Sequence, residues 1–259
     1  MTDDAIDLNY DASGDGPALL LLHGLYGSGN NWRRYARRWS EHYRVLLPDL
    51  RNHGRSPHSE RMDYPAMAAD LLRVLEREGL ERATVLGHSM GGKVAMALAL
   101  TAPQHVAGLI VADMAPVTYE NRGHDAILAA MQAVDLDAVT SRADADAALA
   151  EAVDSPMVRQ FLLTNLERGT EGWRWRLPLE TLRQALPTIQ GWPALDGRWE
   201  APALFVHGER SDYVDAAGRE AIASHFPEAR VESIASAGHW LHVETPDAFT
   251  AAVERYLGD

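Results

Sequence analysis

The 259-residue sequence has no cysteine, few basic residues and no long apolar run. Without cysteine there is no disulfide, thiolate nucleophile or cysteine metal site, so any nucleophile must be an oxygen or an amine. Asp and Glu number 37 against 24 Lys and Arg, a formal net charge of −13, which disfavours binding to nucleic acid or to an anionic membrane surface. No apolar run reaches the roughly 18 residues of a membrane span. Residues Met1–Asp4 lack the features of a signal peptide, so we expect a cytoplasmic protein with no membrane insertion.

Short apolar runs alternate with helical patterns along most of the chain. Helical stretches such as Pro65–Glu78 separate the runs, and a last helix is expected after Thr245. This alternation predicts a doubly wound, mostly parallel sheet of the α/β class. Near the start, Ile6, Leu8 and Tyr10 alternate with polar residues before a turn, which predicts an antiparallel hairpin at the sheet edge. The expected buried strands are Ala18–Leu22, Arg44–Leu47, Ala83–Leu86, Gly108–Ala112, Pro202–Val206 and Arg230–Ile234.

The stretch from residue 116 to residue 195 interrupts this alternation. It has no convincing strand pattern, but helical patterns recur at Asp125–Val134, Ala143–Val153 and Leu179–Leu186. Because it follows the strand that ends near Ala112, it is expected to lie above the carboxyl edge of the sheet, where α/β proteins bind ligands. We therefore expect a core of residues 1–115 and 196–259 with a helical cap of residues 116–195. The alternative is extra packing, with the tryptophans as core anchors.

A Gly-x-Ser-x-Gly motif, Gly87-His88-Ser89-Met90-Gly91, stands between an apolar run and an Ala-rich helical pattern. This spacing is typical of a sharp strand-to-helix turn that lifts a serine hydroxyl out at the end of a strand. A Cβ at Gly87 or Gly91 would obstruct the close approach of strand and helix. Ser89 is therefore the predicted nucleophile, and the backbone N–H of Met90 is a predicted oxyanion donor. The alternative is a tight turn around an inert serine.

A second oxyanion donor is expected where the first apolar run ends in His23-Gly24-Leu25. The Gly-bearing loop lets the backbone N–H of Leu25 face the same point as that of Met90. His23 is expected to satisfy backbone groups in this turn, and a catalytic role for it is the alternative.

Four motifs resemble those of the α/β-hydrolase superfamily, over nearly the whole length of the chain. Within it, the second motif and Ala112–Val117 look like the small acyl esterases and thioesterases allied to the abhydrolase-domain-containing group. The resemblance implies a serine hydrolase of this fold. The motifs are His23-Gly24-Leu25-Tyr26-Gly27-Ser28, Pro48-Asp49-Leu50-Arg51-Asn52-His53-Gly54-Arg55-Ser56, Gly87-His88-Ser89-Met90-Gly91-Gly92 and Ala237-Gly238-His239-Trp240.

A serine hydroxyl needs an imidazole that accepts its proton and returns it to the leaving group. His239 is the expected base, because it follows the last predicted strand in a Gly-bearing loop and because the fold that the motifs resemble places its histidine there. His242, three residues later, is the rival.

The triad also needs a carboxylate that accepts a hydrogen bond from the second imidazole nitrogen. In most of the superfamily it follows the next-to-last strand, but here the usual Asp position holds Ser211, and Asp212 is one step out of register. Asp113, directly after the run Gly108–Ala112, is the other candidate, and the subfamily that the chain resembles has an acid there. We expect Asp113 to be the acid, with Asp212 as the alternative and with Ser211 as a supporting hydrogen-bond partner of His239.

Together these residues predict an esterase that hydrolyses esters, or thioesters, of short to medium acyl chains through an acyl-enzyme. The substrate is expected to be a small-molecule or a polymeric ester. No metal or organic cofactor is implied, and the oligomeric state is not predicted. The alternatives are another reaction of the same scaffold (C–C bond hydrolysis, lactone hydrolysis or perhydrolysis) and a ligand-binding protein without turnover.

Overall fold

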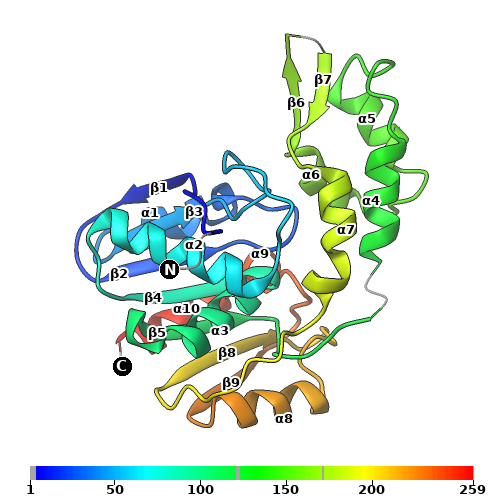
Figure 1. Ribbon diagram of the computed structural model, residues 1–259. Coiled ribbons are helices and arrows are strands. Elements are labelled where there is room, and N and C mark those ends of the chain that lie inside the picture. The colour runs from blue at the N-terminus through cyan, green and yellow to red at the C-terminus, as the bar shows by residue number, and fades with distance from the viewer. Residues whose placement is uncertain (1–3, 121–122, 171, 259) are drawn as a thin grey trace.

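A computed structural model describes residues 4–120, 123–170 and 172–258, so most of Met1–Asp4 lies outside the described residues. A seven-stranded sheet forms its centre, in the order β1-β3-β2-β4-β5-β8-β9 (Figure 1). Every neighbouring pair is parallel except β1 with β3, and the six predicted apolar runs are all strands. The mostly parallel, doubly wound sheet is thereby confirmed. Its strands are β1 (Tyr10–Ser13), β2 (Ala18–Leu22), β3 (Arg44–Pro48), β4 (Ala83–His88), β5 (Val106–Ala112), β8 (Ala203–Gly208) and β9 (Ala229–Ile234).

The prediction of an N-terminal hairpin is wrong about the strand with which β1 pairs. Strand β1 is antiparallel, as expected, but it pairs with β3, and Tyr10 lies opposite Pro48. Strand β2 cannot accept β1 because β3 and β4 occupy its two sides. The strand continues to Ser13, and the chain then turns at Gly14 and Gly16, which have φ values of 74° and 120°.

Helices cover both faces of the sheet because its buried strands are apolar on both sides. Leu20 and Leu22 of β2 belong to one apolar cluster, with α2, α3 and α8, whereas Leu19 and Leu21 belong to a second cluster, with α1 and α10. The helices are α1 (Arg33–Trp39), α2 (Tyr64–Glu78), α3 (Met90–Thr101), α8 (Ala216–His225), α9 (Leu241–Glu244) and α10 (Pro246–Gly258), and short 3-10 turns span Gly29–Trp32 and Pro103–His105.

Residues 116–195, here called the inserted segment, form a group of elements beside the sheet (Figure 1). The expectation that this segment has no strand is wrong, because β6 and β7 pair antiparallel with each other. Each has four residues, too few to show a strand period, and glycines at their ends make the connection short. The elements are α4 (His124–Ala133), α5 (Arg142–Leu149), α6 (Pro156–Leu163), β6 (Leu166–Gly169), β7 (Gly172–Trp175) and α7 (Leu179–Gln190).

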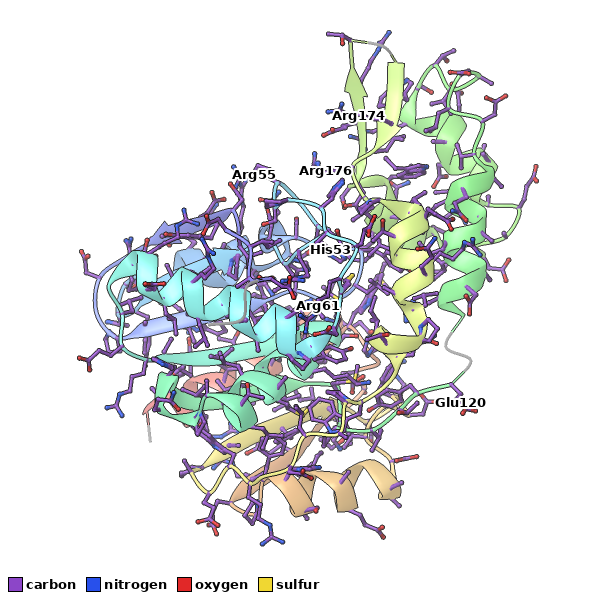
Figure 2. The ribbon with its side chains drawn as sticks, viewed as in Figure 1. His53, Arg55, Arg61, Glu120, Arg174 and Arg176 are labelled. Carbon is purple, nitrogen blue, oxygen red and sulfur yellow. The ribbon has the colours of Figure 1, made fainter. Side chains whose placement is uncertain are left out.

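Polar contacts join the inserted segment to several parts of the rest of the chain, and one of them is a hydrogen bond from Asn165 Nδ2 to the carbonyl oxygen of Tyr26, at 2.8 Å, in the loop after β2. At the end of α7, Lys93 Nζ donates to the carbonyl oxygens of Gln190 at 2.9 Å and Gly191 at 2.6 Å. Near β7, the ring Nε2 of His58 lies 3.1 Å from the carbonyl oxygen of Arg176. Arg176 lies on the side of the β6–β7 hairpin that faces the loop of His53 (Figure 2). The position of the inserted segment is therefore tied to α3 and to the loop after β3.

The loop after β3 is held by buried polar contacts. Arg51 and Asp70 form an ion pair at 2.7 Å, and both side chains are fully buried. Asp49 accepts hydrogen bonds from the backbone N–H groups of Gly29 and Arg55. Asp49, Arg51 and Asp70 therefore have a structural role, because their side chains hold the backbone of this loop in place. Across the described ranges, no helix combines the length and the apolar character needed to cross a bilayer.

Candidate active site

Ser89 lies on the sharp turn between β4 and α3. Its φ of 54° and ψ of −120° are unusual for a residue with a side chain. A Cβ at Gly87 would come within 2.1 Å of the carbonyl oxygen of Gly91, and one at Gly91 within 2.5 Å of that of Leu22. Only glycine fits these two positions, so the motif is required by the close approach of backbone segments, and it presents the Ser89 hydroxyl at the carboxyl edge of the sheet.

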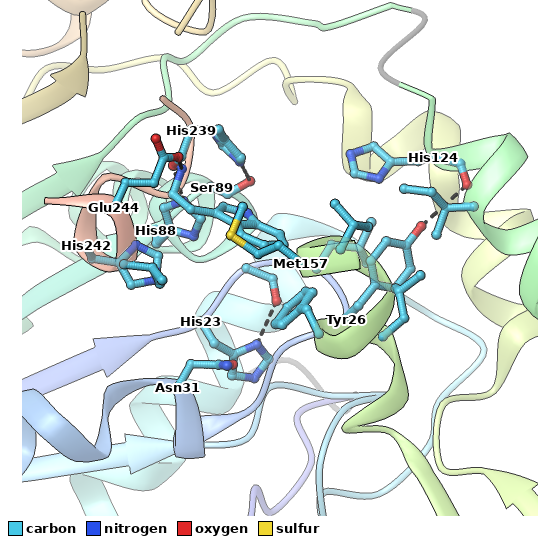
Figure 3. Close-up of a pocket in the computed structure, with 18 of the residues that line it drawn as sticks. His23, Tyr26, Asn31, His88, Ser89, His124, Met157, His239, His242 and Glu244 are labelled. Carbon is cyan, nitrogen blue, oxygen red and sulfur yellow. Dashed lines mark hydrogen bonds between the residues drawn. The ribbon is translucent and has the colours of Figure 1, made fainter. Parts of the chain in front are cut away.

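Three of the predicted site residues form one hydrogen-bonded chain. His239 Nδ1 donates to Asp113 Oδ2 at 2.7 Å, and Ser89 Oγ donates to His239 Nε2 at 3.1 Å (Figure 3 shows the second contact). Because the contact with the carboxylate requires the imidazole proton on Nδ1, Nε2 keeps a lone pair that can receive the serine proton. The Asp113 side chain is fully buried and that of His239 is 26% exposed.

Asp113 is the carboxylate that contacts the imidazole, and two further groups hold it. The backbone N–H of Gly208 donates to Oδ1 at 3.0 Å, and Ser211 Oγ donates to Oδ2. The expected contact between Ser211 and His239 is therefore replaced by a contact with Asp113, because the buried carboxylate is the stronger acceptor within reach. Asp212 is exposed to solvent.

Aromatic rings pack around His239. The ring of Tyr213 stacks on the imidazole, with centroids 4.1 Å apart and planes at 19°. His88 Nε2 donates to the carbonyl oxygen of His239 at 2.8 Å. Burial lowers the pKa of His88 well below its usual value, so it is a neutral donor at neutral pH. Tyr213 and His88 were not predicted as site residues, since no spacing in the sequence shows that they flank His239.

His242, the rival base, lies close by but does not take the position of His239. Its ring stacks on Trp32 with centroids 4.9 Å apart, and burial lowers its pKa to about 3. It lines the same cavity as Ser89, whereas the hydrogen bond to Ser89 Oγ comes from His239. A neutral, buried imidazole of this kind has little basicity for accepting a proton from serine.

The loop that carries Leu25 is held by two buried histidines. His23 Nε2 accepts from the backbone N–H of Leu50 at 3.0 Å, and its Nδ1 donates to the carbonyl oxygen of Gly24 at 2.8 Å, which is the backbone-satisfying arrangement expected for it. His53 Nε2 accepts from the backbone N–H of Tyr26 at 3.1 Å. Burial is the main cause that lowers the pKa of His53 to about 3, so its Nε2 stays free to accept. No pattern in the sequence assigned His53 this role.

Two cavities meet at Ser89. The larger has a volume of about 530 Å³ and extends between the sheet edge and α6 of the inserted segment (Figure 3). The smaller, of about 30 Å³, is lined by Ser89, Met90 and Lys93 among others, and Leu25 lines both. Burial lowers the pKa of Lys93 to about 7. Within the described part of the chain, no group of three His, Asp or Glu side chains has the geometry to hold a metal ion.

Comparison with known proteins gives one consistent family. A family model described as alpha/beta hydrolase fold matches residues 17–246. The chain is 41% identical over 241 residues to a protein of Escherichia coli (strain K12) named esterase YbfF, covering 93% of each. It is 40% identical over 248 residues to the Mus musculus protein named sn-1-specific diacylglycerol lipase ABHD11, covering 93% of this chain and 81% of that one. A solved structure titled marine microorganism esterase superposes with a TM-score of 0.94 at 36% identity, covering 97% of this chain and 99% of that one. This chain belongs to the α/β-hydrolase fold family.

Proposed function

We propose that this protein is a serine esterase that hydrolyses carboxylic esters of short to medium acyl chains through an acyl-enzyme. The observation that carries the proposal is the hydrogen-bonded chain from Asp113 through His239 to Ser89, at 2.7 Å and 3.1 Å. The relatives named as an esterase and a lipase support the coarser statement, a carboxylic ester hydrolase.

In the proposed reaction, Ser89 Oγ attacks the ester carbonyl carbon while His239 Nε2 takes the serine proton. Asp113 keeps the imidazole in the required tautomer and stabilises the imidazolium. The backbone N–H groups of Leu25 and Met90 are the proposed donors to the oxyanion. His239 then gives its proton to the departing alkoxide, which leaves as the alcohol. A water molecule, deprotonated by the same imidazole, hydrolyses the acyl-enzyme to release the acid and free Ser89.

We further propose that residues 116–195 act as a cap over a core of residues 1–115 and 196–259. The support is that Ile127 and Phe161 of this segment line the larger cavity together with Ser89 and His239. A cap in this place controls which acyl and alcohol groups reach the nucleophile. The net charge of −13 supports a substrate without multiple phosphates. Action in the cytoplasm is likewise proposed from the sequence.

A series of p-nitrophenyl esters from acetate to palmitate, assayed beside acyl-CoA thioesters, tests the substrate class. We expect the highest kcat/KM among the short and medium esters and slower turnover of both palmitate and the acyl-CoA compounds. Preferred turnover of the acyl-CoA compounds would instead identify a thioesterase. Tight binding of the esters without turnover would identify a ligand-binding protein and contradict the proposal.

A further inference from the structure

We propose that the large cavity binds the alcohol part of the ester and the small cavity binds the acyl part, so that the preferred substrates are acetyl or propionyl esters of long apolar alcohols. This inference rests on the proposed function and narrows its substrate class. It starts from the position of Ser89, which lines both cavities. A substrate carbonyl attached to Ser89 therefore has one space on each side for its two substituents.

The position of the base decides which substituent enters which cavity. The leaving alkoxide must depart next to the imidazole Nε2 that protonates it. His239 lines the large cavity, together with its neighbour Trp240. The small cavity shares Leu25, Ser89, His124 and Tyr213 with the large one, but His239 does not line it, and it extends toward α3, where Met90 and Lys93 line it. The leaving alcohol is thus directed into the large cavity, and the acyl group is left with the small one.

The size of the small cavity limits the acyl group. A space of roughly 10–15 Å³, measured by the same water-sized sphere, holds one water molecule, so about 30 Å³ suits a methyl or an ethyl group. Its walls are fixed, because Tyr64, Lys93 and Met114 are all buried. The two hydrogen bonds from Lys93 Nζ to the end of α7 hold the base of this cavity in place. A longer acyl chain would have to displace packed side chains.

The walls of the large cavity suit an apolar alcohol. Ile127, Val158 and Phe161 line it on the side of the inserted segment. Two more of its lining residues, Met157 and Val243, are 48% and 56% exposed, which places apolar groups at its mouth. The alcohol part of a substrate, with several methylene groups, can lie along this surface, and its binding is favourable because its apolar area is removed from water.

Two isomeric esters test the assignment on the native protein. Hexyl acetate and ethyl hexanoate contain the same atoms and have leaving groups of similar basicity, but their long chain lies on opposite sides of the carbonyl. We expect kcat/KM for hexyl acetate to exceed that for ethyl hexanoate at least roughly 10-fold, the discrimination that one misplaced methylene can produce. Equal rates, or faster cleavage of ethyl hexanoate, would overturn the assignment. The small cavity would then bind water and not the acyl group.

Failure of the proposed function has a different signature from failure of this inference. If the proposed function fails, a fluorophosphonate does not label Ser89, whether or not the esters are cleaved by another route. If only the inference fails, labelling of Ser89 persists and both esters are cleaved with the opposite preference or with none.

A matched pair of methionine variants tests the two cavities separately. Met114 lines the small cavity and Met157 the large one. Met114→Ala enlarges the acyl side, so the ratio of kcat/KM for hexyl butyrate over hexyl acetate should rise several-fold. Met157→Ala should change the preference among acetate esters of different alcohols and leave that acyl ratio unchanged. An acyl ratio that responds to Met157→Ala and not to Met114→Ala would contradict the assignment.

Discussion

Asp113 holds its carboxylate in a backbone conformation that few residues with a side chain adopt. Its φ is 52°, directly after β5. Such a conformation costs about 1–3 kcal/mol and persists where surrounding contacts impose it. Here Asp113 N donates to the carbonyl oxygen of Val206, and the carboxylate accepts from Gly208 N and Ser211 Oγ. These contacts direct the buried carboxylate toward His239 Nδ1.

Asparagine substitutions distinguish the two candidate acids. In Asp113→Asn the amide can donate to Nδ1 and thereby favour the wrong imidazole tautomer, so we expect kcat to fall about 10³- to 10⁴-fold. Asp212→Asn is the matched control, because Asp212 is exposed, and its kcat should stay near that of the native enzyme. Steady-state kinetics with p-nitrophenyl butyrate measures both. Native turnover in Asp113→Asn together with a large loss in Asp212→Asn would reverse the assignment.

The sequence could identify Ser89 and His239 as partners because each is marked by nearby glycines and by chain order. It could not decide the acid. Strands β5 and β8 are parallel neighbours, so Asp113 and Asp212 both follow strands that end at the same edge. Which carboxylate reaches the imidazole depends on backbone direction after the strand, as the positive φ of Asp113 shows, and a residue pattern does not carry that information.

At the scale of elements, Lys93 joins helix α3 to the end of α7. It is the one lysine of the chain, and its side chain is buried against the rings of Tyr64 and Tyr119. A cationic donor at a helix carboxyl end is favourable, since the last carbonyl groups carry partial negative charge. Desolvation nevertheless lowers the pKa of Lys93 to about 7. The Lys93 amine is therefore expected to change its charge near neutral pH.

A direct titration tests this amine. With ¹³C at Cε of lysine, the protein gives a single lysine resonance, and we expect its chemical shift to titrate with a midpoint near 7 instead of the usual value of 10.5. A midpoint near 10.5 would contradict the structural reading, because it would mean that the amine is exposed to water.

The same group affects stability in a defined direction. Below pH 7 the amine is protonated in both states, whereas between about 7 and 10.5 only the unfolded chain keeps the proton. The free energy of unfolding should therefore rise with pH in this window, by up to about 1.4 kcal/mol per pH unit from this group. Urea unfolding of native protein and Lys93→Met at several pH values isolates the effect, since the variant lacks this slope.

The elements that were predicted well are those whose pattern is local. The apolar runs that became β2, β4 and β5 are buried on both sides, and such runs are visible without knowledge of the partners. The pairing of β1 with β3 depends on a strand 30 residues or more away, and hairpin β6–β7 is too short to show a period. Both therefore required the three-dimensional structure.

At the scale of the whole molecule, charge and apolar surface are separated. The net charge is −13, but the cavity at Ser89 is lined largely by apolar side chains and by histidines. Burial keeps His88 and His242 neutral at neutral pH, because it lowers the pKa of each. The net charge of the molecule therefore opposes the approach of polyanions, whereas the cavity itself presents mainly apolar side chains.

Covalent labelling tests the central claim, that Ser89 is a nucleophile activated by His239, most directly. A fluorophosphonate should modify the native protein at a single site, found by mass spectrometry on the peptide that contains Ser89. Ser89→Ala should not be labelled, and His239→Ala should be labelled far more slowly while keeping the native circular dichroism spectrum. Equal labelling of native protein and Ser89→Ala, or no labelling of folded native protein, would contradict the account.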